Sequence, residues 1–175
     1  MTPEFSRIVR LERISDSGIV REIAADAAER RALARRFAIV AIERLSATVS
    51  LRRTREGDVR LAARISARVV QDCVVTLEPV PGEIEEEVAL LLRPVRSDVP
   101  TPKTVVIPPD EDFEPFAGEA IDIGEAVAVE LALSLDPFPR SPDADSAVDP
   151  GETGELSSPG ADSPFRALEE RSENS

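Results

Sequence analysis

The chain contains no histidine, tryptophan or tyrosine, and it has one cysteine and one lysine. The lack of histidine excludes catalytic triads and metal sites that need an imidazole. Cys73 has no second cysteine with which to form an intrachain disulfide or a cysteine cluster for zinc or iron–sulfur. The lack of tryptophan and tyrosine argues against a surface on which single-stranded bases stack.

Phosphate-binding loops and membrane-spanning segments are also missing from the sequence. The chain has eight glycines but neither a GxxxxGK[ST] nor a GxGxxG motif. No apolar run reaches the roughly 18 residues of a membrane span, and the N-terminus has no signal-peptide pattern. These absences predict a cytoplasmic protein that is not an enzyme, has no cofactor, metal or small-molecule substrate, and works by binding a macromolecular partner.

What the chain does contain is a strong asymmetry of charge. Residues 1–70 hold 15 arginines against 9 acids, a net charge of +6. Residues 71–175 hold 6 basic residues against 25 acids, a net charge of −19. Such a division is typical of an interaction surface in one half and an acidic, solvating half.

Residues 44–53 and 58–70 alternate between apolar and polar side chains with period two. This pattern predicts two half-buried strands, joined by the turn 55–57 that ends in Gly57. With the odd-numbered residues facing the core, the other face carries five arginines: Arg44, Arg52, Arg60, Arg64 and Arg68. The same register places Arg52 opposite Arg60, a like-charge pair that is unfavourable unless solvent or an anion lies between the two side chains.

Other segments complete an α+β fold. Capping pairs predict two amphipathic helices, one from Asp26 to about residue 38 and one over 124–135 behind Asp122. Further strands are expected at 5–14, 19–23, 84–93 and 120–121, and a turn at 78–82. We expect an antiparallel sheet of about five or six strands, open or closed into a barrel, with both helices on one face or end.

The domain boundaries follow from composition. Residues 1–140 are expected to form a single domain that includes a proline-rich acidic loop at 94–115, and 141–175 to form a disordered acidic tail. Cys73 is expected to be a half-buried structural residue at a strand end, because no base stands beside it in the sequence. For the arginines, two interpretations remain: a surface that binds RNA phosphates, or a solvated face paired with acids from the other half.

Two stretches resemble a known family. The segment 67–80 contains Cys73, Leu77, Glu78 and Pro79 in a Cys-x-x-x-Leu-Glu-Pro arrangement, and 136–140 reads Asp-Pro-Phe-Pro-Arg after a capped helix. Over about residues 5–142 the chain resembles the YceD family, the bacterial and plastid large ribosomal RNA subunit accumulation proteins. Many relatives carry a second cysteine where this chain has Thr76.

The resemblance implies a non-enzymatic role in ribosome biogenesis, the accumulation or maturation of large-subunit (23S) ribosomal RNA. The expected partner is ribosomal RNA or a pre-ribosomal particle, contacted through the five arginines. The alternative is an acidic adaptor or chaperone that holds a basic ribosomal protein through the acidic half of the chain.

Overall fold

The computed structural model describes residues 3–15, 17–95 and 113–144. The chain divides into two units, Met1–Ser141 and Pro142–Ser175, and everything below concerns the first. Most of the predicted loop 94–115 and of the predicted tail 141–175 lies outside the described residues.

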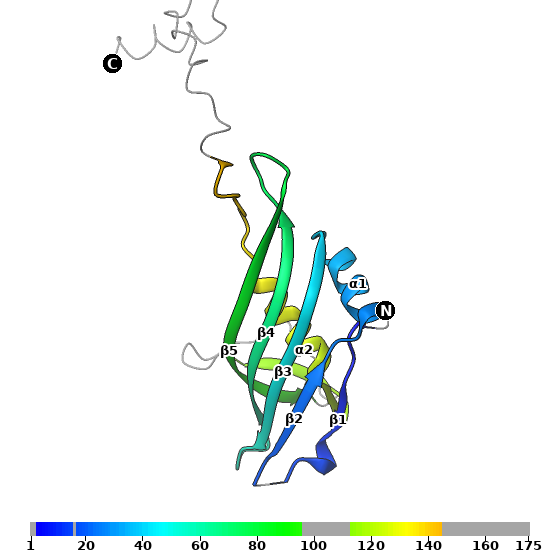
Figure 1. The fold of residues 1–175 in the computed structure, drawn as a ribbon. Coiled ribbons are helices and arrows are strands. Elements are labelled where there is room, and N and C mark those ends of the chain that lie inside the picture. The colour runs from blue at the N-terminus through cyan, green and yellow to red at the C-terminus, as the bar shows by residue number, and fades with distance from the viewer. Residues whose placement is uncertain (1–2, 16, 96–112, 145–175) are drawn as a thin grey trace, which may run out of the picture. The chain divides into compact units, whose positions relative to one another are not determined.

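A five-stranded sheet forms the larger part of the first unit (Figure 1). Its strand order is β2-β3-β4-β5-β6, and β2 and β6 are its two edges, so the sheet is open. The strands are β2 (Ile19–Ala24), β3 (Ala41–Arg53), β4 (Val59–Asp72), β5 (Pro79–Val95) and β6 (Glu114–Ala117). A second sheet pairs β1 (Ile8–Arg10) with β7 (Ala120–Asp122).

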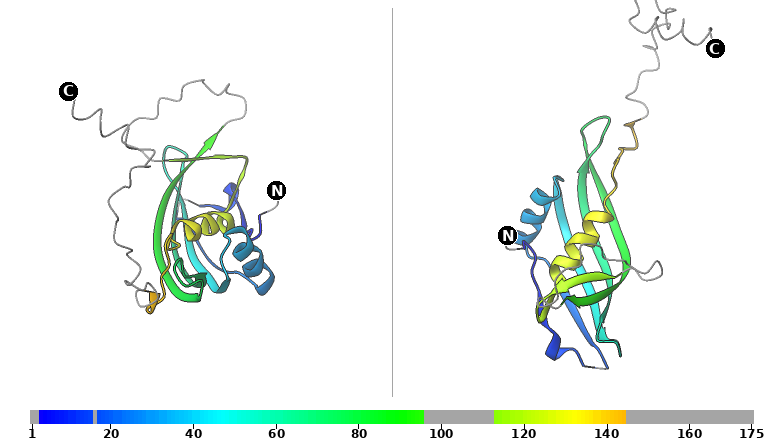
Figure 2. Two further views of the ribbon diagram at one scale, coloured as in Figure 1. Left: turned by 90° about the horizontal axis from the view of Figure 1, so that it is seen from above. Right: turned by 180° about the vertical axis from the view of Figure 1, so that it is seen from behind.

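The two helices, α1 (Ala27–Arg36) and α2 (Ile123–Leu133), lie on the concave side of the five-stranded sheet (Figure 2). Each begins at the predicted cap, because the carboxylate of Asp26 or Asp122 accepts hydrogen bonds from the first free amides of its helix. At Asp26 the capping box with Glu29 is complete. The helices therefore cover one face of the sheet and leave the other to solvent.

The predicted hairpin of β3 and β4 is confirmed. Leu51 pairs with Leu61, and Arg52 pairs with Arg60. The odd-numbered residues over 45–51 and 59–69 are buried, among them Val49 and Ile65. They form the centre of the core with Leu33 of α1 and with Val127 and Leu131 of α2. The alternation of buried and exposed residues thus determines which face of the sheet is exposed to solvent.

Three predictions about the strands are wrong. The sheet is mixed, because β6 runs parallel to β5 while the other neighbours are antiparallel. The strand expected at 5–14 is only Ile8–Arg10, since the chain then enters a short 3-10 helix, Leu11–Arg13. The turn expected at 78–82 belongs to β5, which begins at Pro79.

The reversal between β4 and β5 falls a few residues earlier, at 73–78. The amide of Leu77 donates to the carbonyl of Cys73 at 2.9 Å, and the amide of Cys73 donates to the carbonyl of Glu78 at 2.8 Å. Proline is tolerated as the first residue of a strand, where Pro79 stands. Proline and glycine are typical of turns, but Pro79, Pro81 and Gly82 here belong to β5.

Candidate functional site

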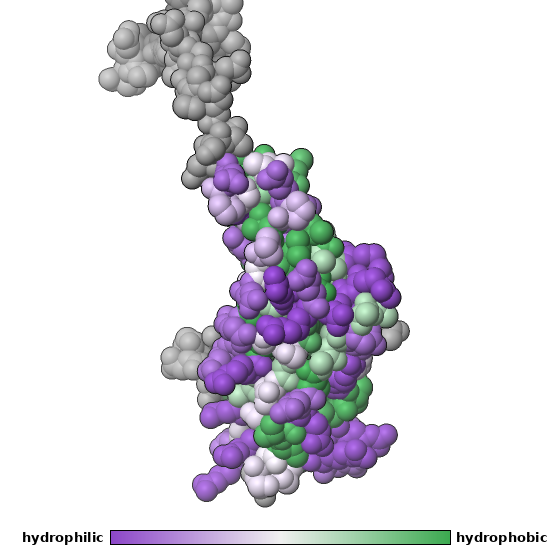
Figure 3. Space-filling model, in the orientation of Figure 1, coloured by the Kyte–Doolittle hydropathy of each residue, from purple (hydrophilic) through white to green (hydrophobic). Residues whose placement is uncertain are grey.

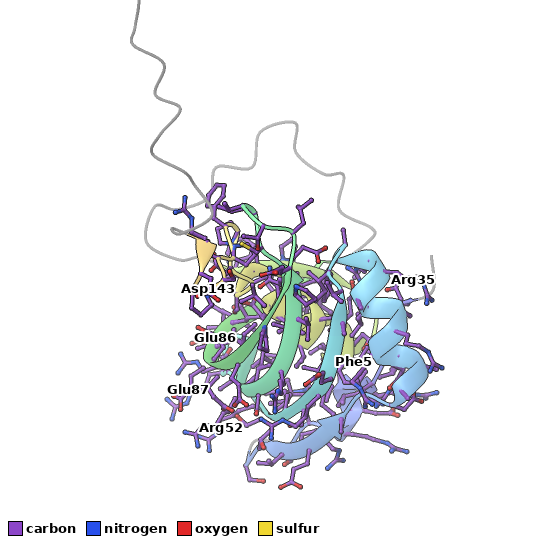
Figure 4. The ribbon with its side chains drawn as sticks, turned by 45° about the horizontal axis from the view of Figure 1, so that its top comes forward. Phe5, Arg35, Arg52, Glu86, Glu87 and Asp143 are labelled. Atoms are coloured by element: carbon purple, nitrogen blue, oxygen red, sulfur yellow. The ribbon has the colours of Figure 1, made fainter. Side chains whose placement is uncertain are left out.

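The five predicted arginines all project from the side of the sheet that the helices leave uncovered, which we call the outer face. Arg44 and Arg52 lie on β3, Arg60, Arg64 and Arg68 lie on β4, and all five are exposed. Hydrophilic residues dominate this face in Figure 3, and Figure 4 shows Arg52 and Glu87 directed away from the helices. Two cross-strand pairs of arginines result: Arg44 with Arg68, and Arg52 with Arg60.

The Arg44–Arg68 pair is surrounded by carboxylates. Glu83 of β5 lies 3.9 Å from Arg44 and 4.0 Å from Arg68. Glu43, at the bulge in β3, lies 3.0 Å from Arg68. The charge of this pair is therefore compensated within the protein, as the solvated-face interpretation expects.

Arg64, in the middle of β4, is also paired. It forms an ion pair with Glu87, its register partner on β5. Next to it, the hydroxyl of Ser66 donates to Glu85 at 2.6 Å and accepts from Arg44 at 3.2 Å. The glutamates of β5 that face outward thus form a row along the arginines, and this row ends at Glu87.

The Arg52–Arg60 pair differs, because no carboxylate of the described residues forms an ion pair with either side chain. The register partner of Arg60 on β5 is Leu91, beyond the end of the glutamate row. Like charges directly opposite each other on a sheet are unfavourable by a few tenths of a kcal/mol up to about 1 kcal/mol. This end of the outer face therefore has an uncompensated positive charge.

Three more exposed arginines gather at the same end: Arg13, Arg53 and Arg55. Arg53 donates to the carbonyl of Leu11 at 2.7 Å, which holds the end of β3 against the 3-10 helix that contains Arg13. Arg55 lies in the β3–β4 turn. We call this set of five, Arg13, Arg52, Arg53, Arg55 and Arg60, the basic end.

Sequence reasoning missed Arg13, Arg53 and Arg55. Strand parity places Arg53 with the buried residues, but it is exposed because the strand ends there. Arg13 comes near the hairpin only through the tertiary contact with Leu11. Of the acids at this end, Asp58 is buried and held by Arg93 at 2.9 Å, and Glu12 lies 3.7 Å from Arg10. Glu56, exposed in the β3–β4 turn, forms no ion pair with Arg52 or Arg60 within the described ranges.

Cys73, the first residue of the family-like motif, is fully buried at the end of β4. Its sulfur accepts hydrogen bonds from the amides of Val75 and Thr76, each at 3.4 Å, and from the amide of Ser141 at 3.3 Å. The hydroxyl of Thr76, followed by these amides, lowers the pKa of the thiol to about 6, although burial acts in the opposite direction. Sequence reasoning looked for a base beside Cys73 and missed this shift of the thiol pKa, which comes from the Thr76 hydroxyl and from backbone amides that the turn brings to the sulfur.

The other motif residues shape that turn. Leu77 has a φ of 60°, a left-handed conformation, and its side chain is 76% exposed. Glu78 supplies the carbonyl that accepts from Cys73, and Pro79 starts β5. Among the described residues, no group of three or more acidic or cysteine side chains could hold a metal ion.

The fold and the site thus define a small α+β protein with a charged outer sheet face. A family model, Large ribosomal RNA subunit accumulation protein YceD, matches residues 61–171, more than half of the chain. The chain belongs to this family, which confirms the resemblance seen in the sequence. The family's name implies a role in the accumulation of large-subunit ribosomal RNA.

No curated protein and no solved structure matches the chain. The matched residues include the Cys73–Pro79 motif, α2 and the segment 136–140. None of the helices in the described part of the chain is long and apolar enough to cross a membrane.

Proposed function

We propose that this protein supports the accumulation of large-subunit (23S) ribosomal RNA by binding that RNA directly, without catalysing a reaction. The observation that carries the proposal is the contrast between the two arginine pairs of the outer face. Arg44 and Arg68 are compensated by glutamates, whereas Arg52 and Arg60 are not. An RNA phosphate between Arg52 and Arg60 would relieve their repulsion.

Arginine is suited to this contact, because its planar guanidinium binds a phosphate through two hydrogen bonds. Each neutralised phosphate releases counterions, which supplies sequence-independent affinity. With a net charge of −13, the whole chain repels RNA. Binding therefore depends on a local positive surface, and the basic end is such a surface.

Because of the glutamate row, the two ends of the outer face differ in charge. Glu83, Glu85 and Glu87 hold the arginines beside them and repel phosphates there. RNA would accordingly contact the outer face at the Arg52–Arg60 end and be turned away from the Arg44–Arg68 end. In this proposal only two of the five predicted arginines make the primary contact.

The proposal is tested by complementation of a strain that lacks the gene. The variants Arg52→Gln/Arg60→Gln and Arg44→Gln/Arg68→Gln remove the same number of charges from cross-strand pairs of one hairpin. We expect the first to restore less than half of the wild-type ratio of large- to small-subunit ribosomal RNA, and the second to restore nearly all of it. Equal restoration by both, with equal protein levels, would overturn the proposal.

A second candidate function is an adaptor for a basic ribosomal protein. A different surface favours it, formed by the β4–β5 turn and the end of α2, where exposed apolar side chains lie among carboxylates. Nuclease treatment separates the two candidates. If the complex with pre-ribosomal particles dissociates when the RNA is digested, direct RNA binding is supported. If one basic protein stays bound after digestion, the adaptor is supported.

A further inference from the structure

Large apolar side chains are exposed at the end of the first unit that lies opposite to the basic end. Leu77, Leu133 and Phe138 are 76%, 74% and 72% exposed, and Val74 and Val75 are 47% and 36% exposed. Green residues are visible around the β4–β5 turn in Figure 3. We call Val74, Val75, Leu77, Leu133 and Phe138 the apolar end. Exposed apolar side chains that gather in this way mark interaction sites more often than single ones do.

Hydrogen bonds hold the two parts of the apolar end together. The amide of Val74 donates to the carbonyl of Pro139 at 2.9 Å, and the amide of Ser141 donates to the sulfur of Cys73 at 3.3 Å. Gln71, near the end of β4, donates to the carbonyl of Asp136 at 2.8 Å. The turn 73–78 and the segment 136–141 therefore form one fixed surface.

A shallow groove runs beside this surface. Its apolar lining comes from the end of α1, the end of α2 and the prolines that follow α2: Phe37, Ile39, Leu133, Leu135, Pro137 and Pro139. Asp72 and Asp136 also line it. The groove thus offers apolar contacts next to carboxylates.

The turn holds the apolar side chain of Leu77 toward solvent in a backbone conformation that costs free energy. Its left-handed backbone conformation is unfavourable for a residue with a side chain, and burial does not repay that cost, because the side chain is exposed. Three hydrogen bonds to Cys73 Sγ and the Leu77–Cys73 backbone bond fix the turn. A side chain held in this way loses little conformational freedom when a partner binds it.

The charges around the apolar end indicate what kind of partner fits. The exposed carboxylates of Asp72, Glu78 and Asp136 lie on the segments that form it. Arg140 is the one basic residue in 71–79 and 133–141. A surface with this excess of acids repels phosphates and attracts lysine and arginine.

We propose that the apolar end docks a basic protein segment that inserts apolar side chains beside Leu77 and Phe138. Both parts of this surface lie within residues 61–171, the range that the family model matches. The inference rests on the second candidate function, for which it names the docking residues, and it does not rest on RNA binding at the basic end. It concerns different residues, and either proposal can fail alone.

The test uses the full-length protein and three labelled peptides, with binding followed by fluorescence anisotropy. One peptide alternates leucine with lysine, the second replaces lysine by glutamate, and the third replaces leucine by serine. We expect measurable affinity for the leucine–lysine peptide alone. Leu77→Ser/Phe138→Ser should weaken it at least tenfold, and Asp72→Asn/Glu78→Gln should weaken it severalfold and reduce its salt dependence.

Two controls make the result specific. Val20→Ser removes another exposed apolar side chain, 60% exposed on β2, and should leave peptide affinity unchanged. Arg52→Gln/Arg60→Gln should also leave it unchanged. Equal binding of the glutamate or serine peptides, or equal loss of affinity in Val20→Ser, would overturn the proposal.

Discussion

At the scale of single residues, Cys73 shows how a backbone can change the chemistry of a side chain. In relatives with a second cysteine, the position of Thr76 would carry a thiol, whereas here the Thr76 hydroxyl is the largest cause of the lowered pKa of the Cys73 thiol. Together with the amides of Val75, Thr76 and Ser141, it makes the thiolate the favoured form near neutral pH.

This shift predicts a pH-dependent contribution to stability. The folded pKa of about 6 lies below the ordinary value of 9.0, so below pH 6 the thiol is neutral in both states and contributes nothing. Between pH 6 and 9 the folded state holds a thiolate and the unfolded state a thiol, so the contribution grows as the pH rises. The difference in unfolding free energy between wild type and Cys73→Ser, from urea titrations, should increase over that range.

Thr76→Val is the matched variant for this prediction. It removes the largest cause of the shift and keeps the sulfur, so the thiol should titrate at higher pH in the ultraviolet absorbance of the thiolate. A wild-type thiol that titrates near its ordinary value, or a stability difference that does not vary with pH, would refute this account of Cys73.

At the scale of elements, the two helix caps look alike in sequence but differ in structure. Asp26 accepts only from amides of its own helix, Ala28 and Glu29. Asp122 caps α2 and also accepts from the amide of Arg7 at 2.7 Å and from the hydroxyl of Ser6 at 2.5 Å. It therefore ties α2 to the strand that begins the chain.

We expect Asp26→Ala to lower the unfolding free energy by about 1 kcal/mol, the usual cost of a lost cap. Asp122→Ala should cost about 2–3 kcal/mol, because it also leaves the Arg7 amide and the Ser6 hydroxyl without their acceptor. Glu56→Ala, an exposed turn residue, serves as control and should change stability by less than about 0.5 kcal/mol. Equal losses for Asp26→Ala and Asp122→Ala in urea unfolding would contradict the tie between α2 and the N-terminal strand.

The same scale separates what the sequence could predict from what it could not. The β3–β4 hairpin was predictable, because alternation and one turn glycine specify both faces and the register. The short extent of β1 within the strand expected at 5–14 and the parallel strand β6 were not, because three or four residues form a strand only when a partner is present. The partner of β1 is β7, more than a hundred residues away in the chain.

The candidate site was predictable to a similar degree. Alternation placed all five arginines on the exposed face, and the Arg52–Arg60 pair followed from the hairpin register. Which arginines have carboxylate partners depends on the register of β5 against β4, and the misplaced turn at 78–82 left that register open. The contributions of Arg13 and Arg53 depend on a single tertiary contact.

At the scale of the molecule, the first unit carries two unlike surfaces at the ends of its long strands. From Arg60 to Asp72, β4 spans roughly 40 Å at about 3.3 Å per residue. RNA at the basic end and a protein segment at the apolar end would therefore not compete for space. The proposals together describe a factor that brings a basic protein and ribosomal RNA together.

The central claim is that RNA contacts the outer face at Arg52 and Arg60, and its most direct test is a salt titration. Binding of full-length protein to large-subunit ribosomal RNA fragments is measured for wild type, Arg52→Gln/Arg60→Gln and Arg44→Gln/Arg68→Gln. The account predicts that the first variant reduces the slope of log affinity against log salt by about 0.7–0.9, from loss of the one phosphate contact that the two arginines share. It predicts almost no change for the second variant, whose arginines are already neutralised by Glu43 and Glu83. No binding by the wild type at low salt, or equal changes in both variants, would contradict it.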